Sequence, residues 1–505
     1  METYDLAVIG AGAAGLAAAQ TGVALGKRTV IIERDRLGGE CTWNGCVPSK
    51  ALIEAARLCH DLTAARRFGI GAGPVRVDFP AVMAHVQDVI ATIASFEDED
   101  HLQKAGIAVR RGNATITGAT TVTVDGEVLG ADRIAVCTGS RPAVPPIEGL
   151  DKVPHLTNEN LFDLSALPRQ LIVIGAGPIG LEMAQAFRRL GSDVEVVDVV
   201  DTLLPREDPQ VASLARQLLE DEGVKFSLGV QVRAVVRAQK EYRVTLSSGA
   251  AGSHGDESTS AGRQSAEREL IGDAVLVATG RRPRVEDLGL ETVGVKIERR
   301  GVAVDEHCRT SVETIYAAGD VTGLLPFTHA AAYQGRIAAS NALGSRSKAD
   351  YRVVPWVTFT DPEIAHLGLT EPEARKEHGE IEVACLPYTA IDRAVIQRQV
   401  RGLIKVIAKG KPVIGTRFGG GEIVGAHIVG PNASDLIHEF ADIMQTRSFT
   451  GRLAQTIHAY PTMSLGVQQA VAQLFPLGRA TSGDLRESLA EREEFSGSRD
   501  AAPSS

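Results

Sequence analysis

The sequence predicts an α/β protein with two Rossmann-like βαβ units and a smaller α+β region after them. Two observations carry the α/β prediction: a glycine-rich motif joins an apolar strand to an alanine-rich helix near the N-terminus, and the same pattern returns about 165 residues later. A third observation predicts the last region, where β-branched segments separated by turns precede an amphipathic helical stretch. At 505 residues the chain is long enough for several domains.

The first unit is "YDLAVIGAGAAGLAAAQTGVALGKRTVIIER", residues 4–34. Gly10, Gly12 and Gly15 stand between its first strand and its helix, and the second strand ends at Glu33. Such glycines permit a tight turn and close approach of a pyrophosphate, while the helix N-terminus offers N–H groups and partial positive charge. Glu33 lies 23 positions after Gly10, near the spacing at which a carboxylate reaches a ribose diol.

The second unit repeats this pattern in "LIVIGAGPIGLEMAQAFRRLGSDVEVVD", residues 171–198. Gly175, Gly177 and Gly180 form the motif, and Asp198 follows Gly175 by the same 23 positions. One such motif by itself is weak evidence, but two copies in strand–helix–strand context, each with its acid, predict two bound dinucleotides.

Two stretches are predicted to lack a core of their own. Residues of about 249–268 are rich in glycine, serine and charge, and they separate two strand-like segments, which is typical of a disordered hairpin insertion. The end of the chain, 479–505, is predicted to be a frayed tail.

Composition and charge exclude several classes of partner. The net charge is −10 and no run of lysine and arginine occurs, so a nucleic acid backbone would be repelled. No apolar stretch of about 20 residues is free of glycine and charge, and "METYDLAVIG" enters a strand without a signal peptide. We therefore predict a cytoplasmic protein with no nucleic acid and no membrane partner.

Two of the six cysteines, Cys41 and Cys46, lie close together in "GGECTWNGCVPSK", residues 38–50. A zinc site usually takes four ligands, and no second pair of cysteines or histidines adjoins this one, so we predict no metal site. Two unrelated buried thiols and a redox disulfide are the other readings. The glycines around the pair and Lys50 one turn beyond it favour the redox reading.

The spacing sets a geometric condition on a disulfide. Two residues five apart in a regular helix lie roughly 8.6 Å apart at Cα, whereas a disulfide needs less than about 7 Å. The segment must therefore be partly unwound, which Gly45 permits. A helix that begins here would lower the pKa of the thiols through its N–H dipoles.

These motifs together resemble the flavoprotein disulfide reductases (class I pyridine nucleotide-disulfide oxidoreductases), the family of dihydrolipoamide dehydrogenase, glutathione reductase and mercuric reductase. The resemblance covers about 1–475, and the cysteine segment is its most specific element. Four further motifs stand in the order of the family: "CTGSRP" (137–142), "VATGRRP" (277–283), "TIYAAGD" (314–320) and "HAYPTMS" (458–464).

The resemblance implies a domain plan and a set of binding residues. An FAD-binding domain is expected at 1–150 and 280–348, an NAD(P)-binding domain at 151–279, and a dimerisation domain at 349–478, which makes the protein a homodimer. The residues expected to bind FAD are Gly10, Gly12, Gly15, Glu33, Lys50, Gly112, Ala114, Thr138, Gly139, Ser140 and Asp320. Gly280 and His329 are also expected to bind a cofactor. Those expected to bind the nicotinamide cofactor are Gly175, Gly177, Gly180 and Asp198.

The resemblance also implies the path of the electrons. Hydride passes from NAD(P)H to the flavin, the flavin reduces the disulfide at Cys46, and Cys41 exchanges with the substrate. Lys50 is expected near the flavin N5, with Glu182 as its partner. Because Asp198 would repel a 2′-phosphate, we predict NADH as the cofactor and NADPH as the less favoured one.

The sequence departs from the family near its end. Dithiol-oxidising members carry a histidine before the proline of the last motif and a glutamate five residues after it, but here those positions are Tyr460 and Leu465. A tyrosine resembles the mercuric reductase branch, and we expect Tyr460 at the active site. That branch also uses a C-terminal cysteine pair, yet no cysteine follows Cys385.

We therefore predict an FAD-dependent oxidoreductase that passes electrons from NAD(P)H to a small disulfide, a metal ion or another small acceptor. It is expected to be most similar to mercuric reductase-like proteins. Two alternatives stay open: a dihydrolipoyl dehydrogenase, and a flavin-binding interaction module without turnover.

Overall fold

The computed structural model describes residues 1–71, 73–248, 267–410 and 420–475. These form two compact units. Unit 1 comprises Met1–Val199 and Val224–Asp350, and unit 2 comprises Val200–Gly223 and the chain from Tyr351 onward. The predicted tail, and the predicted insertion up to residue 266, lie outside the described residues. The division of unit 1 at residues 150 and 280 stays a prediction.

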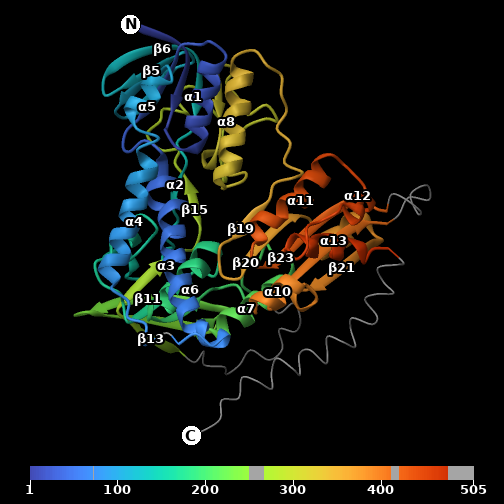
Figure 1. Ribbon diagram of the computed structural model, residues 1–505. Coiled ribbons are helices and arrows are strands. Elements are labelled where there is room, and N and C mark those ends of the chain that lie inside the picture. Colours follow the sequence, from blue (N-terminus) through green and yellow to red (C-terminus); the bar gives the residue numbers. More distant parts are fainter. Residues whose placement is uncertain (72, 249–266, 411–419, 476–505) are drawn as a thin grey trace, which may run out of the picture. The chain divides into compact units, whose positions relative to one another are not determined.

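The two βαβ units stand where the glycine motifs predict them (Figure 1). In each, an apolar parallel strand ends at the first glycine, and the helix begins three residues after that glycine. In the first unit Glu33 is the last residue of the second strand, and in the second unit Asp198 directly follows that strand. The elements are β1 (Glu2–Ile9), α1 (Ala13–Ala24), β2 (Thr29–Glu33), β8 (Gln170–Ile174), α6 (Pro178–Leu190) and β9 (Asp193–Val197).

The first sheet of unit 1 has seven strands in the order β3-β2-β1-β6-β5-β4, with β18 also paired to β6. Strands β1, β2, β3, β6 and β18 run parallel, so their carboxyl ends meet at one edge of the sheet. Ligands of open α/β sheets bind at this edge. The further strands are β3 (Ile107–Arg111), β4 (Ala114–Gly118), β5 (Thr121–Val124), β6 (Glu127–Val136) and β18 (Ile315–Ala317).

A second, four-stranded parallel sheet of unit 1 has the order β10-β9-β8-β14. The described residues of this unit also form a three-stranded antiparallel sheet, β11-β12-β13, and two short two-stranded ribbons. Their bounds are β7 (Ser140–Pro142), β10 (Lys225–Ser227), β11 (Val230–Ala238), β12 (Glu241–Ser248), β13 (Arg268–Gly272), β14 (Ala274–Val277), β15 (Arg281–Pro283), β16 (Ile297–Glu298) and β17 (Gly301–Val302).

The remaining helices of unit 1 include two that carry the cysteines. The pair is divided between α2 (Gly39–Asn44) and α3 (Cys46–Ala64), with Gly45 between them, so the helix is interrupted as a disulfide requires. The others are α4 (Phe79–Ala94), α5 (Glu99–Lys104), α8 (Thr328–Ala342) and the 3₁₀ turns η1 (Ala65–Phe68), η2 (Leu150–Lys152), η3 (Leu161–Asp163) and η5 (Asp320–Thr322).

Among the described residues, one helical stretch, Phe79–Lys104, is long and apolar enough by composition to cross a membrane. It is divided into α4 and α5, and α4 has 16 residues, fewer than the roughly 20 that a span requires. The stretch is weak evidence for a membrane segment, and the cytoplasmic location stays a prediction.

Unit 2 contains the predicted α+β region together with Val200–Gly223, a segment inside the predicted NAD(P)-binding range 151–279. Its five-stranded antiparallel sheet has the order β19-β20-β23-β22-β21, and the central strands β22 and β23 are buried along nearly their whole length. Helices α11 and α13 cover it with Phe440 and Val467, which belong to its hydrophobic core. The elements are β19 (Trp356–Thr358), β20 (Glu363–Gly368), β21 (Ile381–Pro387), β22 (Leu403–Lys409), β23 (Ile423–Gly430), α7 (Pro209–Asp221), α9 (Glu371–His378), η6 (Tyr388–Ala390), α10 (Asp392–Gln397), α11 (Ala433–Gln445), α12 (Thr450–Gln455) and α13 (Ser464–Ala472).

Within unit 1, helices α1 and α8 pack side by side against the first sheet (Figure 1). Both are rich in small residues, and their backbones come close at Gly335 of α8. A Cβ atom built at Gly335 would lie 2.1 Å from the carbonyl oxygen of Ala14. This contact therefore holds the start of α1, the first glycine-loop helix, in a fixed position against α8.

We predict that Gly335→Ala destabilises the protein, although the same change stabilises most helices. The added methyl group meets backbone atoms of α1, and overpacking of this kind costs about 1–3 kcal/mol. The exposed neighbouring change Arg336→Ala should alter stability by less than about 0.5 kcal/mol. Thermal unfolding of both variants measures the difference. An unfolding temperature of Gly335→Ala at or above that of the unmutated protein would show that α1 and α8 can move apart.

Candidate active site

Cys41 and Cys46, the two cysteines of residues 38–50, both contact Thr328. Thr328, the first residue of α8, places its Oγ1 atom 3.3 Å from Cys41 Sγ and 3.5 Å from Cys46 Sγ. Both cysteines are free thiols in this structure, and Cys41 hydrogen-bonds to Cys46. Thr328 was not among the site residues predicted from the sequence. The one feature of the sequence that could have indicated Thr328 is its position next to His329, a predicted cofactor-binding residue.

The break in the helix at Gly45 is a steric requirement. A Cβ atom at this position would lie 2.9 Å from the carbonyl oxygen of Glu40 and 3.0 Å from Cys41 Cα. Only glycine lets the chain pass this close to the turn that carries Cys41. The turn brings the side chains of Cys41 and Cys46 to the same side, whereas a continuous helix would hold them apart.

The two thiols differ in acidity. The pKa of Cys46 is lowered to about 6, first because Cys41 donates a hydrogen bond to it, and further because Thr328 and the positive charge of Lys50 favour the thiolate. The pKa of Cys41 is raised, because its hydrogen bond to Cys46 and its burial favour the thiol. At pH 7 the pair therefore holds one thiolate, on Cys46.

Lys50 lies on α3, one turn beyond Cys46. Its Nζ atom forms an ion pair of 2.8 Å with Glu182 Oε2 of α6. The Glu182 side chain is 6% exposed, whereas the Lys50 side chain is 33% exposed. The carboxylate is therefore buried, and the lysine side chain is partly open to solvent. A buried carboxylate of this kind needs its cation, and it fixes the place of the lysine.

The first glycine loop is built by close backbone contacts. A Cβ atom at Gly15 would lie 1.8 Å from the carbonyl oxygen of Gly10, and Gly10 itself has a φ of +101°. Glu33 Oε2 accepts a hydrogen bond of 2.7 Å from the backbone N–H of Ala11, which ties the acid to the loop. A Cβ atom at Gly39, at the start of α2, would lie 2.5 Å from Gly12 Cα, so the cysteine segment rests directly on this loop.

The second loop has the same construction. A Cβ atom at Gly180 would lie 2.0 Å from the carbonyl oxygen of Gly175, and Asp198 Oδ2 accepts a hydrogen bond of 2.6 Å from Ala176 N–H. Around Gly177, no atom of a described residue other than its chain neighbours lies within 4 Å of a built Cβ. The loop is thus closely packed at Gly175 and Gly180 and open at Gly177, next to the N-terminus of the helix. Such a loop can accommodate a pyrophosphate.

The other predicted FAD residues of unit 1 follow the parallel strands of the first sheet. Gly112 comes after β3, Thr138, Gly139 and Ser140 after β6, and Asp320 after β18, all near the carboxyl edge that carries Gly10. Ser140 Oγ donates a hydrogen bond of 2.5 Å to Asp320 Oδ2. The remaining predicted cofactor-binding residues are placed as follows: Ala114 begins β4, Gly280 precedes β15, and His329 of α8 stacks on Phe327.

A polar network at this edge includes two residues that were not predicted from the sequence, Arg281 and Glu40. The Arg281 guanidinium donates to Ser140 Oγ at 2.7 Å, lies 3.5 Å from Asp320 Oδ2, and pairs with Glu40. Glu40 directly precedes Cys41. The network therefore joins the helix of the cysteine pair to the residues after β6 and β18.

The fold and this geometry were compared with known proteins. A model of the pyridine nucleotide-disulphide oxidoreductases matches residues 4–335, and the model of their dimerisation domain matches residues 354–471. The chain belongs to the pyridine nucleotide-disulphide oxidoreductase family. The predicted fold class and enzyme class are thereby confirmed, and the family implies FAD, a pyridine nucleotide and a homodimer.

Relatives of two kinds share this fold over nearly the whole chain. A mercuric reductase of Streptomyces lividans is 37% identical over 94% of this chain and 96% of its own. A dihydrolipoyl dehydrogenase of Thermus scotoductus is 35% identical over 94% and 98%. Among solved structures, the Cu(II) complex of the HOCl-induced flavoprotein disulfide reductase RclA of Escherichia coli matches with a TM-score of 0.80 and 27% identity, over 94% of this chain and 99% of that one.

Unit 2 carries Tyr460, the residue at which the sequence departs from dithiol-oxidising members. Its side chain is 70% exposed, and its hydroxyl donates a hydrogen bond of 3.0 Å to Asp392 Oδ2, which raises the pKa of the phenol. His458 lies two residues earlier and is enclosed. Its Nε2 is 2.8 Å from Glu439 Oε2, and its Nδ1 is 2.9 Å from the carbonyl oxygen of Thr456.

We predict that the thiolate of Cys46 forms in the dithiol enzyme with a midpoint near pH 6. Because its pKa lies below the ordinary thiol value, the thiolate is complete above about pH 7 and is lost as the pH falls through 6. A long-wavelength charge-transfer absorption between this thiolate and the flavin of the FAD-loaded protein should follow the same curve. Lys50→Met should move the midpoint to higher pH.

The controls are cysteine variants. Cys46→Ser should abolish the band, whereas Cys41→Ser and Cys59→Ser should keep it; Cys59 lies further along the same helix α3. A band that survives in Cys46→Ser and vanishes in Cys41→Ser would reverse the assignment of the two sulfur atoms.

Proposed function

We propose that this family member passes electrons from NADH, through FAD and the Cys41–Cys46 pair, to a small thiophilic acceptor. The observation that carries the proposal is the pairing of a thiolate-forming cysteine with a neighbour of raised pKa, beside the Lys50–Glu182 ion pair. FAD supplies the two-electron chemistry between nicotinamide and disulfide when it is bound. The glycine loops with Glu33 and Asp198 would hold the two dinucleotides.

The chain's own residues have separate tasks in this proposal. Lys50 holds positive charge near Cys46, which keeps that sulfur ionised when the disulfide opens. Thr328 can donate its hydroxyl hydrogen to either sulfur, because it lies within 3.5 Å of both. Cys41, the thiol of raised pKa, would exchange with the acceptor. Each thiolate leaves more readily where such donors stabilise it.

The surroundings of Tyr460 favour an acceptor that does not need a general base. A neutral phenol bonded to Asp392 removes a proton poorly at pH 7, and Leu465 has no carboxylate to support a base. Both ring nitrogens of His458 form hydrogen bonds inside unit 2, one with the carbonyl oxygen of Thr456 and one with Glu439. A thiophilic metal ion, the class that the relatives' names mercuric reductase and Cu(II) complex include, needs a thiolate and no base.

The dimerisation domain supports a homodimer. In unit 2, large apolar side chains are exposed where a partner subunit would cover them. They are Val395 and Ile396 on α10, Phe449 before α12, and Ile457 beside Tyr460, with Ile457 96% exposed. We propose that Tyr460 acts at the dimer interface, as the resemblance implies.

Cofactor preference follows from Asp198. We predict a higher kcat/KM for NADH than for NADPH, because the carboxylate accepts hydrogen bonds from a 2′-hydroxyl and repels a 2′-phosphate. Asp198→Asn should lower kcat/KM for NADH about 10-fold or more, the worth of a hydrogen bond to a charged group. Asp193→Asn, an exposed change at the start of the same strand β9, should leave both values unaltered. Equal use of the two cofactors by the unmutated enzyme would contradict the preference.

The acceptor is tested by separating the two half-reactions. We predict that NADH reduces the flavin quickly, and that turnover with Hg(II) or Cu(II) thiol complexes exceeds turnover with dihydrolipoamide and NAD⁺. A positioned base contributes about 10² to 10⁴ in rate, so dithiol turnover should be depressed by a similar factor. Tyr460→His should raise dithiol turnover, and Tyr460→Phe should not.

Two outcomes would overturn the proposal. Fast dihydrolipoamide turnover by the unmutated enzyme would identify it as a dihydrolipoyl dehydrogenase with another base. Flavin that NADH leaves oxidised under anaerobic conditions would identify a binding module without turnover.

A further inference from the structure

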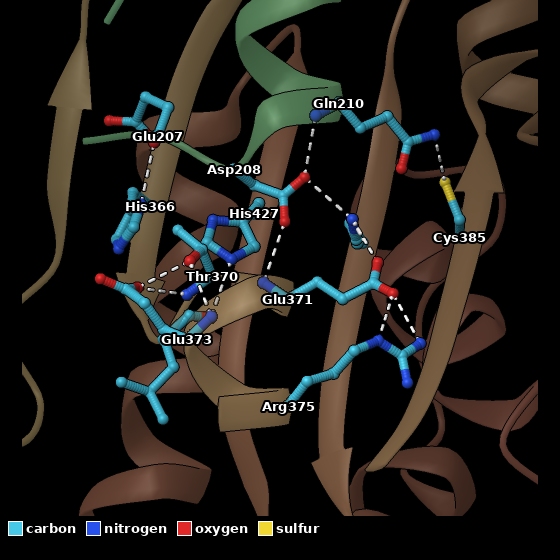
Figure 2. Close-up of polar contacts among 12 residues, drawn as sticks. Glu207, Asp208, Gln210, His366, Thr370, Glu371, Glu373, Arg375, Cys385 and His427 are labelled. Atoms are coloured by element: carbon cyan, nitrogen blue, oxygen red, sulfur yellow. Dashed lines mark hydrogen bonds and ion pairs between the residues drawn. The ribbon is translucent and has the colours of Figure 1, made fainter. Parts of the chain in front are cut away.

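Unit 2 contains a buried cluster of two histidines and a carboxylate, far in the sequence from the cysteine pair (Figure 2). His366 of β20 and His427 of β23 are directly opposed in the antiparallel sheet, and Glu207 comes from the segment before α7. Their side chains are essentially closed to solvent, with exposures of 1% for His366, 0% for His427 and 3% for the Glu207 side chain. The ligand atoms of the three residues all lie within 4.8 Å of one another.

The hydrogen bonds of the two rings turn the same nitrogen toward this cluster. His366 Nε2 donates to the carbonyl oxygen of Gly368 at 2.9 Å, and His427 Nε2 donates to the carbonyl oxygen of Leu369 at 3.1 Å. Both Nδ1 atoms therefore face the cluster. Metal-binding histidines characteristically donate their other ring N–H to a backbone carbonyl in this way, which fixes the tautomer and the direction of the free nitrogen.

His427 Nδ1 is the second, independent observation. This atom is buried, and within the part of the chain that the structure describes it has no hydrogen-bond partner. Because His427 Nε2 donates to the carbonyl oxygen of Leu369, Nδ1 is the ring nitrogen that carries the lone pair. An interior lone pair without a donor is unfavourable, and a cation would satisfy it.

We propose that Glu207, His366 and His427 form a binding site for one divalent transition-metal ion, with Zn²⁺ as the first choice. Two imidazoles and one carboxylate are a ligand set that zinc and its neighbours in the first transition row prefer. The proposal concerns the dimerisation domain and does not rest on the proposed function. It departs from the sequence analysis, which predicted no metal site.

A proton between His366 Nδ1 and Glu207 Oε2 would have to leave before an ion could bind. His366 Nδ1 lies 2.9 Å from Glu207 Oε2, and because His366 Nε2 already donates to the carbonyl oxygen of Gly368, one hydrogen is shared between Nδ1 and Oε2. An incoming M²⁺ would take the lone pairs of His366 Nδ1, His427 Nδ1 and Glu207 Oε2 and release that single proton to solvent. No electron is transferred, and the charge of the cluster rises by one.

The surroundings fix the carboxylate in place for this exchange. Trp356 Nε1 donates to Glu207 Oε1 at 2.6 Å, so Oε2 is the oxygen left for the histidines. The Trp356 ring also stacks on the His366 ring, with centroids 3.6 Å apart, and forms an apolar wall. Three ligands at about 2.1 Å from one ion lie roughly 3 to 4 Å apart, so the cluster needs shifts below about 1 Å to close around it.

Other charged groups near the cluster are already paired with one another. Asp208 Oδ1 accepts from Lys405 Nζ at 2.8 Å, and its Oδ2 accepts from the backbone N–H of Glu371 at 3.0 Å. Figure 2 shows this second network beside the histidines. Glu371 also binds Lys405 and Arg375, Glu373 closes the cap of α9 with Thr370, and Arg206 lies over Trp356. Glu207 is thus the carboxylate whose oxygen faces the histidines, through its contact with His366 Nδ1.

The test uses the full-length, FAD-loaded protein carrying Cys41→Ser and Cys46→Ser, so that the vicinal thiols cannot take the metal. After treatment with a chelator, Zn²⁺ is added and binding is measured by calorimetry and by metal analysis. We expect one ion per chain and the release of about one proton, read from the dependence of the heat on the buffer. His427→Gln and Glu207→Gln should each weaken binding at least about tenfold. His438→Gln, an exposed histidine of α11 in the same unit, should not.

X-ray absorption at the zinc edge keeps the test independent of whether the buried variants fold. The site without substitution should show nitrogen and oxygen ligands at about 2.0–2.1 Å with the outer-shell pattern of two imidazoles. Absence of stoichiometric binding, sulfur in the first shell, or an equal loss in His438→Gln would overturn the proposal. The cluster would then be an ion pair that fastens the segment before α7 to the sheet.

Discussion

The turn at Gly45 is the constraint on which the rest of the active site depends. Because a side chain there would collide with the backbone of Glu40 and Cys41, only glycine allows α2 and α3 to meet at this angle. The turn opposes Cys41 to Cys46 and makes Cys46 the first residue of a long helix. That position gives the sulfur the N–H dipoles of the helix, and it places Lys50 one turn further on.

Further contacts join this turn to the first glycine loop and to the residues that follow strands β6 and β18. Gly39 rests on Gly12, Glu40 pairs with Arg281, and Arg281 reaches Ser140 and Asp320. The cysteine segment is thus tied to the carboxyl edge of the first sheet from both sides. Since the charges of Glu40, Arg281 and Asp320 partly cancel, the network can be enclosed without leaving an unpaired ion.

The local patterns of the sequence predicted much of this fold, and the reason is physical. A strand, a glycine loop, a helix and a terminal acid are specified within about 30 residues, so both βαβ units were predicted close to their observed limits. The contacts between residues far apart in the sequence could not be predicted in this way. Arg281 and Glu40 are 241 residues apart, and Thr328 is 287 residues from Cys41. No periodicity links such positions, and the Lys50–Glu182 pair was expected only through the family resemblance. The same holds for His366 and Glu207, which are separated by 159 residues.

Helix α8 has a further consequence for how this protein can change. Its first residue touches both sulfur atoms, and seven residues later Gly335 lies against the backbone of α1. Successive residues of a helix are rotated by about 100°, so an insertion or deletion between these two points would turn Thr328 away from the dithiol. The spacing between Thr328 and Gly335 is therefore fixed in this protein by contacts at both ends. A chimeric enzyme that exchanges α8 must exchange the cysteine segment and α1 in matching register.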